Sequence, residues 1–281
     1  MKIAISAENT IDLPKELLDK YDIHVISFDI TLGDQTSNSY TSAEVFDYVD
    51  KTGILPKTSA LNEVEYGEYF DSLLKDYDAV IHFALGSGIS STINNANRAA
   101  KERKNCYVVD SQSLSTGIAL PAIYASKLAA KGMNAKDIYE KVNARIPYVQ
   151  ASFVVERLDY LHKGGRCSGL ALFGANLLKI RPQIVVKDGK MQPGKKYRGR
   201  MEDVFKKYCE DTLNEFNNPD KSIGFVTYTS ASDEMVNIGI DALKGAGFET
   251  VYNTFAGPTI GSHCGRNTIG ILYINDGEQD D

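Results

Sequence analysis

The strongest chemical signal in this sequence is an apolar strand that ends in glycine and serine and leads into a helix. Residues 79–85 form an apolar run that is long enough for a buried strand and too short for a core helix. Gly86-Ser87-Gly88 breaks this run, and a stretch of helical composition begins near Ser91. Backbone N–H groups and hydroxyls then converge at the positive end of a helix dipole, which predicts an anion site. The alternative is that Ser90 or Ser91 only caps the helix and the glycines serve the turn.

Two further loops carry polar groups beside glycine or proline. Residues 56–59 (Pro-Lys-Thr-Ser) place the hydroxyls of Thr58 and Ser59 between helical segments, where a capping role is the alternative. In the Lys-Gly-Gly-Arg stretch at 163–166, the paired glycines permit a positive φ or a close backbone approach and fix Arg166 in place. Arg166 can bind a carboxylate there or form an ion pair between domains.

A glycine-rich loop at 257–265 holds His263, one of four histidines in the chain. A histidine in such a loop between two strands is a candidate for ligand binding or proton transfer, with a structural role as the alternative. Cys264 is its neighbour, but adjacent residues in a strand-like loop point apart, so we do not expect a catalytic Cys–His pair.

The common enzyme signatures are missing from the sequence. Residues 86–90 lack the spacing of a GxSxG nucleophile elbow, and neither GxGxxG nor a Walker GxxxxGK[ST] motif occurs. The histidines are not at metal-ligand spacing from one another or from cysteine. We therefore predict no catalytic residue, no metal site and no cofactor other than a bound ligand.

Composition limits the class of protein. The chain has 281 residues, a natural length for two domains, with 43% hydrophobic and 24% charged residues. No apolar stretch approaches the length of a membrane helix, about 20 residues. The apolar run at the N-terminus becomes polar after too few residues to be a signal peptide. The cysteines form no CxxC pair. These features predict a cytoplasmic protein. The net charge of -6 argues against broad nucleic-acid binding.

The elements that must position these loops alternate between strand and helix in the first half of the chain. Strand patterns lie at 2–6, 24–32, 79–85 and 105–110, and helical patterns at 13–21, 42–51, 63–75, 91–104, 115–131 and from 134 onward. Pro121 should kink the fifth of these helices or mark its true start. This alternation predicts an α/β domain over residues 1–150, with a mainly parallel sheet and covering helices.

The second half, residues 151–281, has a mixed pattern and predicts a second α/β domain of α+β character. Strand patterns lie at 151–155, 182–187, 190–192, 223–229, 250–255 and 268–274, and helical patterns at 201–216 and 234–244, with two short helical pieces on either side of residues 164–166. Asp188-Gly189 is a strong hairpin signal. No low-complexity linker separates the halves, so we expect the domains to pack directly and form a cleft.

Taken in order, the loop motifs resemble those of the DegV family, the fatty-acid-binding subunits of bacterial fatty acid kinase. The resemblance covers nearly the whole chain and rests on segments 8–14, 56–59, 86–92, 109–111 with Gly117, 158–166, 179–182 with 188–189, and 257–265. The chain departs from the family pattern at Glu8-Asn9, Ser90-Ser91-Thr92 and Gly265-Arg266-Asn267, where family members usually have Asp-Ser, Ser-Gly-Thr and Gly-Pro-Gly.

The resemblance implies a two-domain DegV-like fold that holds one long-chain fatty acid between its domains. It implies that Ser90 and Thr58 bind the carboxylate and that His263 lies at the head group. The neighbouring hydroxyls of Ser59 and Thr92 belong to the expected carboxylate site. Arg166 and Gly165 are expected to support the head-group site without contacting the carboxylate directly. Burying a C16 chain contributes on the order of 10 kcal/mol at about 0.8 kcal/mol per methylene.

The resemblance also implies a protein partner. A separate kinase subunit would phosphorylate the carboxylate, so the chain itself is expected to be a non-enzymatic carrier, with at most transient contact with a membrane surface. Lys196, Arg198 and Arg200 lie in a basic cluster at the position of the family's docking segment, and a merely solvated surface is the alternative. Two rival functions stay open. One is a hydrolase or acyltransferase using Ser90 and His263, and the other is a carrier of a different apolar acid.

Overall fold

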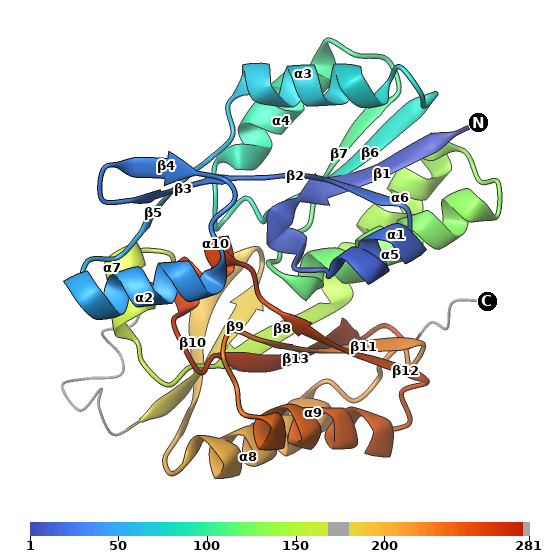
Figure 1. Ribbon diagram of the computed structural model, residues 1–281. Helices are drawn as coiled ribbons and strands as arrows, with labels where there is room; N and C mark the ends of the chain where they lie inside the picture. Colours follow the sequence, from blue (N-terminus) through green and yellow to red (C-terminus); the bar gives the residue numbers. More distant parts are fainter. Residues whose placement is uncertain (168–179, 278–281) are drawn as a thin grey trace.

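The computed structural model describes residues 1–167 and 180–277, in which two β-sheets are stacked with helices between and outside them (Figure 1). The first sheet consists, in spatial order, of β2 (Ile23–Ile26), β1 (Ile3–Glu8), β6 (Ala79–Ala84) and β7 (Cys106–Asp110). Each neighbouring pair in it is parallel. The central strands β1 and β6 are buried along their whole length, as expected for a parallel sheet covered on both faces.

The second sheet is mixed. Its strands, in spatial order, are β10 (Lys190–Tyr197), β9 (Arg181–Lys187), β8 (Val149–Val154), β13 (Ile269–Ile274), β11 (Ile223–Tyr228) and β12 (Thr250–Phe255). Only the β11–β12 pair is parallel, and the others are antiparallel. The predicted fold class, a parallel α/β half followed by a mixed half, is confirmed.

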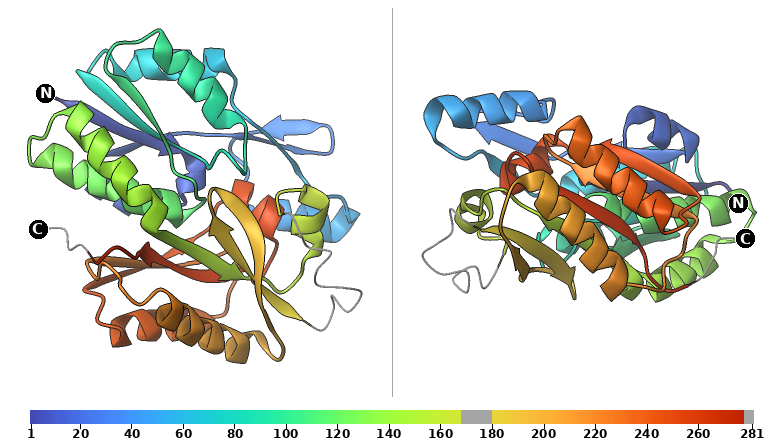
Figure 2. Two further views of the ribbon diagram at one scale, coloured as in Figure 1. Left: turned by 180° about the vertical axis from the view of Figure 1, so that it is seen from behind. Right: turned by 90° about the horizontal axis from the view of Figure 1, so that it is seen from below.

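Helices form the remaining layers (Figures 1 and 2). They are α1 (Lys15–Lys20), α2 (Ser42–Thr52), α3 (Glu63–Leu73), α4 (Thr92–Lys101), α5 (Thr116–Ala130), α6 (Ala135–Arg145), α7 (Asp159–Gly164), α8 (Met201–Glu215), α9 (Asp233–Gly245) and α10 (Pro258–Cys264). α3 and α4 cover the outer face of the first sheet, and α8 and α9 cover the outer face of the second.

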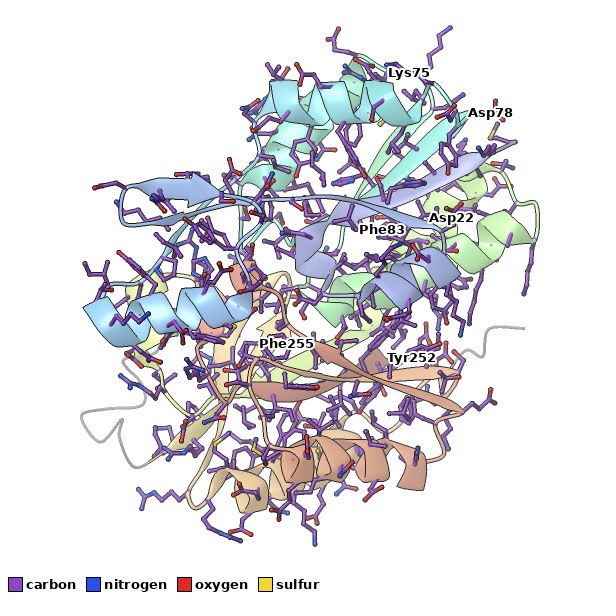
Figure 3. All side chains as sticks on the ribbon, in the orientation of Figure 1. Asp22, Lys75, Asp78, Phe83, Tyr252 and Phe255 are labelled. Carbon is purple, nitrogen blue, oxygen red and sulfur yellow. The ribbon has the colours of Figure 1, made fainter. Side chains whose placement is uncertain are left out.

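Helix α5 lies between the two sheets and packs against strands of both. Most of its residues are buried, as expected for a helix without a solvent-facing side. The helix begins at Thr116 and runs through Pro121, so the proline does not mark its start. Side chains from both sheets meet around α5 in one hydrophobic core, and Figure 3 shows them filling this layer.

The boundary predicted near residues 149–151 falls at the start of β8. Because the core around α5 includes side chains from both sides of that point, the division into two domains stays a prediction. Within the described residues, no helix combines the length and apolar character needed to cross a membrane.

Several predicted elements differ from the structure. The segment 24–32 is not one strand, because β2 ends at Ile26 and a separate strand, β3 (Asp29–Leu32), follows. β3 forms a small antiparallel sheet with β4 (Gln35–Ser37) and β5 (Lys57–Ser59), which the sequence patterns did not indicate. The second short helical piece expected after Arg166 lies outside the described residues.

Candidate functional site

A cavity of about 300 Å³ lies beside the point where the first sheet reverses its strand order. The chain adds β2 on one side of β1 and β6 on the other, so the crevice at the carboxyl ends of β1 and β6 is the expected ligand position in an open α/β sheet. The loop that follows β6 lines this cavity. Among the described residues, the polar side chains of its wall are those of Thr58, Ser59, Ser90, Ser91, Arg166, Thr259 and His263.

Backbone hydrogen bonds hold the loop after β6 in shape. The Gly86 N–H donates to the Ser113 carbonyl at 2.9 Å, and the Ser87 N–H donates to Oδ1 of Asp110 at 3.0 Å. The Ser90 N–H turns back to the Gly86 carbonyl at 3.1 Å. The shape of this loop therefore depends on its hydrogen bonds to the end of β7 and the residues just after it. Ser90 lies in a hydrogen-bonded turn of the loop and lines the cavity.

The hydroxyl of Ser90 contacts the start of α4, and Ser90 also lines the cavity. Its Oγ accepts the N–H of Thr92, the first residue of α4, at 3.2 Å, whereas Ser91 makes no side-chain cap bond. Ser90 thus supports the helix start and also lines the cavity. Because Oγ acts as the acceptor in this bond, its own proton is left to donate to a ligand.

Glycine is required at position 88 of the same loop. A Cβ at Gly88 would overlap the carbonyl oxygen of Gly189, at the tip of the β9–β10 hairpin. The Asp188-Gly189 hairpin predicted from the sequence is therefore present and rests directly on the loop. Met191, just after the turn, lines the cavity.

Thr58 and His263 meet across the cavity although they lie far apart in the sequence. Oγ1 of Thr58 and Nε2 of His263 are 2.9 Å apart. Neither segment has the predicted local structure: Thr58 lies on strand β5, and His263 lies on helix α10 rather than in a loop. Pro258 at the first helical position starts this short helix. Gly261 lets it approach α2 closely, because a Cβ there would lie 3.2 Å from the Phe46 ring.

The imidazole of His263 is electrically neutral at physiological pH. Burial, together with the nearby positive charge of Arg166, lowers the pKa of His263 to about 4. Gly164, the last residue of α7, allows the ring to sit there, since a Cβ at Gly164 would be 2.9 Å from Nδ1. A neutral imidazole beside a hydroxyl can donate or accept a hydrogen bond without adding charge to the site.

Arg166 lies in the wall of the cavity rather than behind it. Gly165 ends α7 with a φ of 65°, which turns the chain and brings Arg166 back over the helix end. Nη1 of Arg166 donates to the Gly164 carbonyl at 2.6 Å. Arg166 therefore lies in the cavity wall, and its role as a support for the head group stays a prediction.

Thr92 is not among the described residues that line the cavity, in contrast to its expected place in the carboxylate site. It is fully buried, and its Oγ1 lies 2.6 Å from the hydroxyl of Tyr66. Its side chain faces inward because the first turn of α4 packs against α3, which carries Tyr66. Thr92 reaches the site only through its backbone bond to Ser90.

A second, smaller cavity lies next to the first, on the side of the mixed sheet. It measures about 30 Å³ and shares Leu114, Ile260 and Cys264 with the larger cavity. Its far wall includes Phe153 and Leu272 of β8 and β13. The two cavities therefore share part of their walls, which places the polar residues next to the interior between the sheets.

Residues that depart from the family pattern have identifiable contacts. The Asn9 side chain accepts the N–H of Phe28, a cavity residue, at 3.2 Å. Arg266 lies 2.9 Å from Asp50 and above the Phe46 ring, so it ties the end of α10 to α2. The amide of Asn267 donates to Glu156 at 2.7 Å.

The sequence reasoning missed the anchor of α10. Asp12 is buried, and its Oδ1 accepts the N–H of Gly257, which precedes the helix, at 2.8 Å. Its Oδ2 accepts the Ser115 hydroxyl at 2.5 Å. Asp12 lies inside the motif segment 8–14, but only the fold shows that it holds the helix that carries His263.

The basic cluster is partly neutralised by its neighbours. Lys195 pairs with Glu215 at 3.2 Å, and Arg200 pairs with Asp203 at 3.0 Å. Lys196 is exposed and also has contacts of its own. Within the described part of the chain, Arg198 is exposed and has no carboxylate partner. Arg198 lies just past the end of β10. At a rise of about 3.3 Å per residue, it is about 23 Å along the strand from Met191.

Around His263, no Ser–His–acid arrangement is formed by the described residues 1–167 and 180–277. The side-chain partner of His263 is Thr58, that of Ser90 is the Thr92 N–H, and no carboxylate is bonded to the imidazole. Burial raises the pKa of the adjacent Cys264 thiol to about 12, which keeps it protonated. The site has hydrogen-bond donors for an anion but lacks an activated nucleophile.

With this architecture, the chain belongs to the DegV family. The family model described as "uncharacterised protein, DegV family" matches residues 2–276. A relative from Thermotoga maritima, named a fatty acid-binding protein, is 31% identical over 284 residues, covering 96% of each chain.

Solved structures show the same fold. The crystal structure of DegV from Bacillus subtilis, described as a fatty acid binding protein, is 27% identical, with a TM-score of 0.85 over 98% of this chain and 100% of that chain. A DegV family protein from Thermus thermophilus matches with a TM-score of 0.89 at 24% identity, over 98% of this chain and 100% of that chain.

Proposed function

We propose that this protein binds one long-chain fatty acid in the cavity between its two sheets. The observation that carries the proposal is that a cavity with hydrogen-bonding side chains adjoins a second cavity in the interior between the sheets. Thr58, Ser90 and His263 line the larger cavity, and Leu114 and Ile260 line both cavities. A buried carboxylate is costly unless it is hydrogen-bonded, and these groups supply donors. The named ligands of the related proteins support the same ligand class.

The first test identifies the ligand. Protein purified without added lipid is extracted and examined by mass spectrometry, both denatured and native. A released free fatty acid supports the carrier, whereas a covalent acyl-serine would support the rival acyltransferase. Release of a different apolar acid would support the other rival function, a carrier of that acid.

The second test concerns the carboxylate site. Ser90→Ala and Thr58→Val should each weaken palmitate binding by about 1–3 kcal/mol, the cost of leaving a buried acceptor unpaired. Matched controls are Ser87→Ala, in the same loop but exposed, and Thr36→Val, exposed on the neighbouring small sheet. Equal affinity of the site variants and their controls would remove the head-group assignment.

We further propose that the bound carboxylate is presented to a separate kinase subunit. Transfer of the γ-phosphoryl group of ATP to a carboxylate oxygen would give an acyl-phosphate and ADP in that subunit. Neutral donors support this role because they satisfy the carboxylate while leaving its charge available for attack. Lys196, Arg198 and Arg200 are the proposed docking surface, with Arg198 the most available cation.

A further inference from the structure

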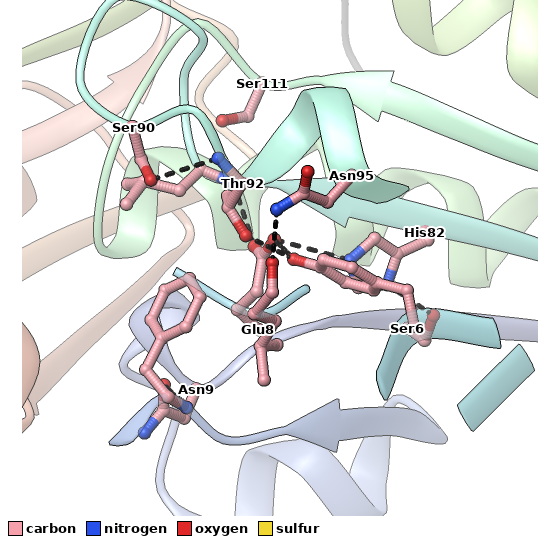
Figure 4. Close-up of polar contacts among 12 residues, drawn as sticks. Ser6, Glu8, Asn9, His82, Ser90, Thr92, Asn95 and Ser111 are labelled. Atoms are coloured by element: carbon pink, nitrogen blue, oxygen red, sulfur yellow. Dashed lines mark hydrogen bonds and ion pairs between the residues drawn. The ribbon is translucent and has the colours of Figure 1, made fainter. Parts of the chain in front are cut away.

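A buried chain of polar side chains lies behind the cavity, at the carboxyl ends of β1 and β6. Glu8 ends β1, Tyr66 lies on α3 and Thr92 begins α4, and all three are fully buried. The Tyr66 hydroxyl donates to Oε1 of Glu8 at 2.6 Å and lies 2.6 Å from Oγ1 of Thr92. Figure 4 shows Glu8 and Thr92 converging at this point. None of the three lines the cavity, so direct contact with a ligand does not explain why these polar side chains are buried here.

The Glu8 end of this chain is firmly held. Oε2 of Glu8 accepts the N–H of Leu85 at 2.8 Å, and Nε2 of His82 lies 3.5 Å from Oε1. Nδ1 of the same imidazole is 2.9 Å from the Ser6 hydroxyl (Figure 4). Because each neighbour is buried, a displacement of the carboxylate would leave several polar groups without partners.

The direction of the hydrogen bonds follows from the tyrosine. Burial, with a further contribution from the charge of Glu8, raises the pKa of Tyr66 far above its usual value, so the hydroxyl keeps its proton. That proton goes to Glu8, and the Thr92 hydroxyl must then donate to the Tyr66 oxygen. The side chain of Thr92 is therefore fixed in one orientation.

We infer that Glu8, Tyr66 and Thr92 act as positioning residues for the ligand-binding hydroxyl of Ser90. Thr92 links the two regions, since its side chain binds Tyr66 and its backbone N–H donates to Oγ of Ser90 at 3.2 Å. This bond occupies an acceptor position of Oγ and leaves the Ser90 proton for the cavity. The inference rests on the proposed function and extends it to residues that never touch the ligand.

The test is a double-mutant cycle with palmitate as the probe. Thr92→Val removes the hydroxyl at constant shape, and Thr92→Ser is the matched control that keeps it. We expect Thr92→Val to weaken palmitate binding about 3- to 10-fold, the range of one hydrogen bond, and Thr92→Ser to restore it. In a Ser90→Ala background, Thr92→Val should have no further effect, because positioning acts only through Ser90.

Each outcome separates the inference from the proposed function. If Ser90→Ala alone binds palmitate normally, the head-group assignment fails and the positioning role fails with it. If Ser90→Ala weakens binding but Thr92→Val does not, or if the Thr92→Val loss is the same in both backgrounds, only the positioning role is overturned. Should Thr92→Val not fold, as judged by its thermal melt, Tyr66→Phe replaces it in the same cycle.

An independent readout uses [1-¹³C]palmitate bound to each variant. The carboxyl chemical shift reports the hydrogen bond from Ser90, which general loosening of the core would not move in a specific direction. Thr92→Val and Tyr66→Phe should shift this resonance in the same direction as Ser90→Ala. A wild-type shift in both variants would overturn the inference.

Discussion

The carboxylate of Asp12 should make the stability of this protein fall as pH rises, and Asp12→Asn should remove that dependence. Burial raises the pKa of Asp12 from 3.8 to about 7, despite opposing hydrogen bonds from Ser115 and Gly257. The native state therefore holds a proton that the unfolded state has lost. Between these two pKa values, stability declines by about 1.4 kcal/mol per pH unit.

The stability that protonated Asp12 contributes is fully present below the pKa that Asp12 has in the unfolded state. It is lost as pH rises through the pKa that Asp12 has in the folded state. Between about pH 5 and about pH 8, Asp12 should cost the wild type about 2.5 kcal/mol of unfolding free energy. The substituted asparagine keeps an oxygen for the Gly257 N–H, and asparagine tolerates the positive φ of 54° at this position. Asp12→Asn should therefore gain stability relative to the wild type as pH rises.

Denaturant unfolding of both proteins across this pH range measures the difference. His263 titrates in the opposite direction, because its folded pKa of about 4 lies below its ordinary value of 6.5, but it does so equally in both proteins and cancels. Asp34→Asn, in the exposed turn after β3, is the matched control and should follow the wild type. If the difference between Asp12→Asn and the wild type stays constant with pH, the raised pKa is wrong.

Three further outcomes are expected. His263→Ala should impair phosphorylation by the kinase more than it impairs palmitate binding, and equal losses in the two assays would make His263 only a ligand contact. Gly164→Ala should weaken palmitate binding by about 1 kcal/mol, because the added Cβ would displace the imidazole of His263. Gly245→Ala is the control, because this residue also lies at a helix end but has open space around it, and it should leave palmitate binding unchanged. Titration calorimetry measures both affinities. Arg198→Glu with Arg200→Glu should leave lipid binding intact and slow acyl-phosphate formation in a salt-dependent way, and normal coupling at low ionic strength would show that these cations are only surface.

Local patterns were sufficient wherever neighbouring residues in the chain decide the structure. The apolar run before Gly86 forms the central strand β6, and Asp188-Gly189 forms the hairpin between β9 and β10. The helical pattern predicted from residue 134 onward is α6, and Asn134 caps it by accepting the N–H of Asp137. In each case the deciding contacts lie within a few residues, so sequence alone carries the information.

The errors fall where distant segments decide the structure. Thr58 lies on a strand only because β3 pairs with it, and residues 257–265 form a helix because α2 and Asp12 hold it. Both segments are short and rich in small or polar residues, so their own preferences are weak. Motif resemblance singled out Thr58, Ser90 and His263, which the structure brings to the wall of one cavity, but it could not show that Thr92 faces the core.

The placement of Arg166 bears on whether the site stores a carboxylate or prepares it for reaction. A guanidinium that gripped the carboxylate in a bidentate pair would bind it strongly and also withdraw its charge. Here Nη1 of Arg166 is bound to the Gly164 carbonyl, while the Thr58 hydroxyl and the neutral imidazole of His263 face the same cavity. Arg166 thus adds positive potential to the cavity and, as a smaller effect than burial, lowers the pKa of His263 and keeps it uncharged. If the proposed function holds, this arrangement would hold a fatty acid mainly through its tail and leave the carboxylate free to accept a phosphoryl group from the kinase subunit.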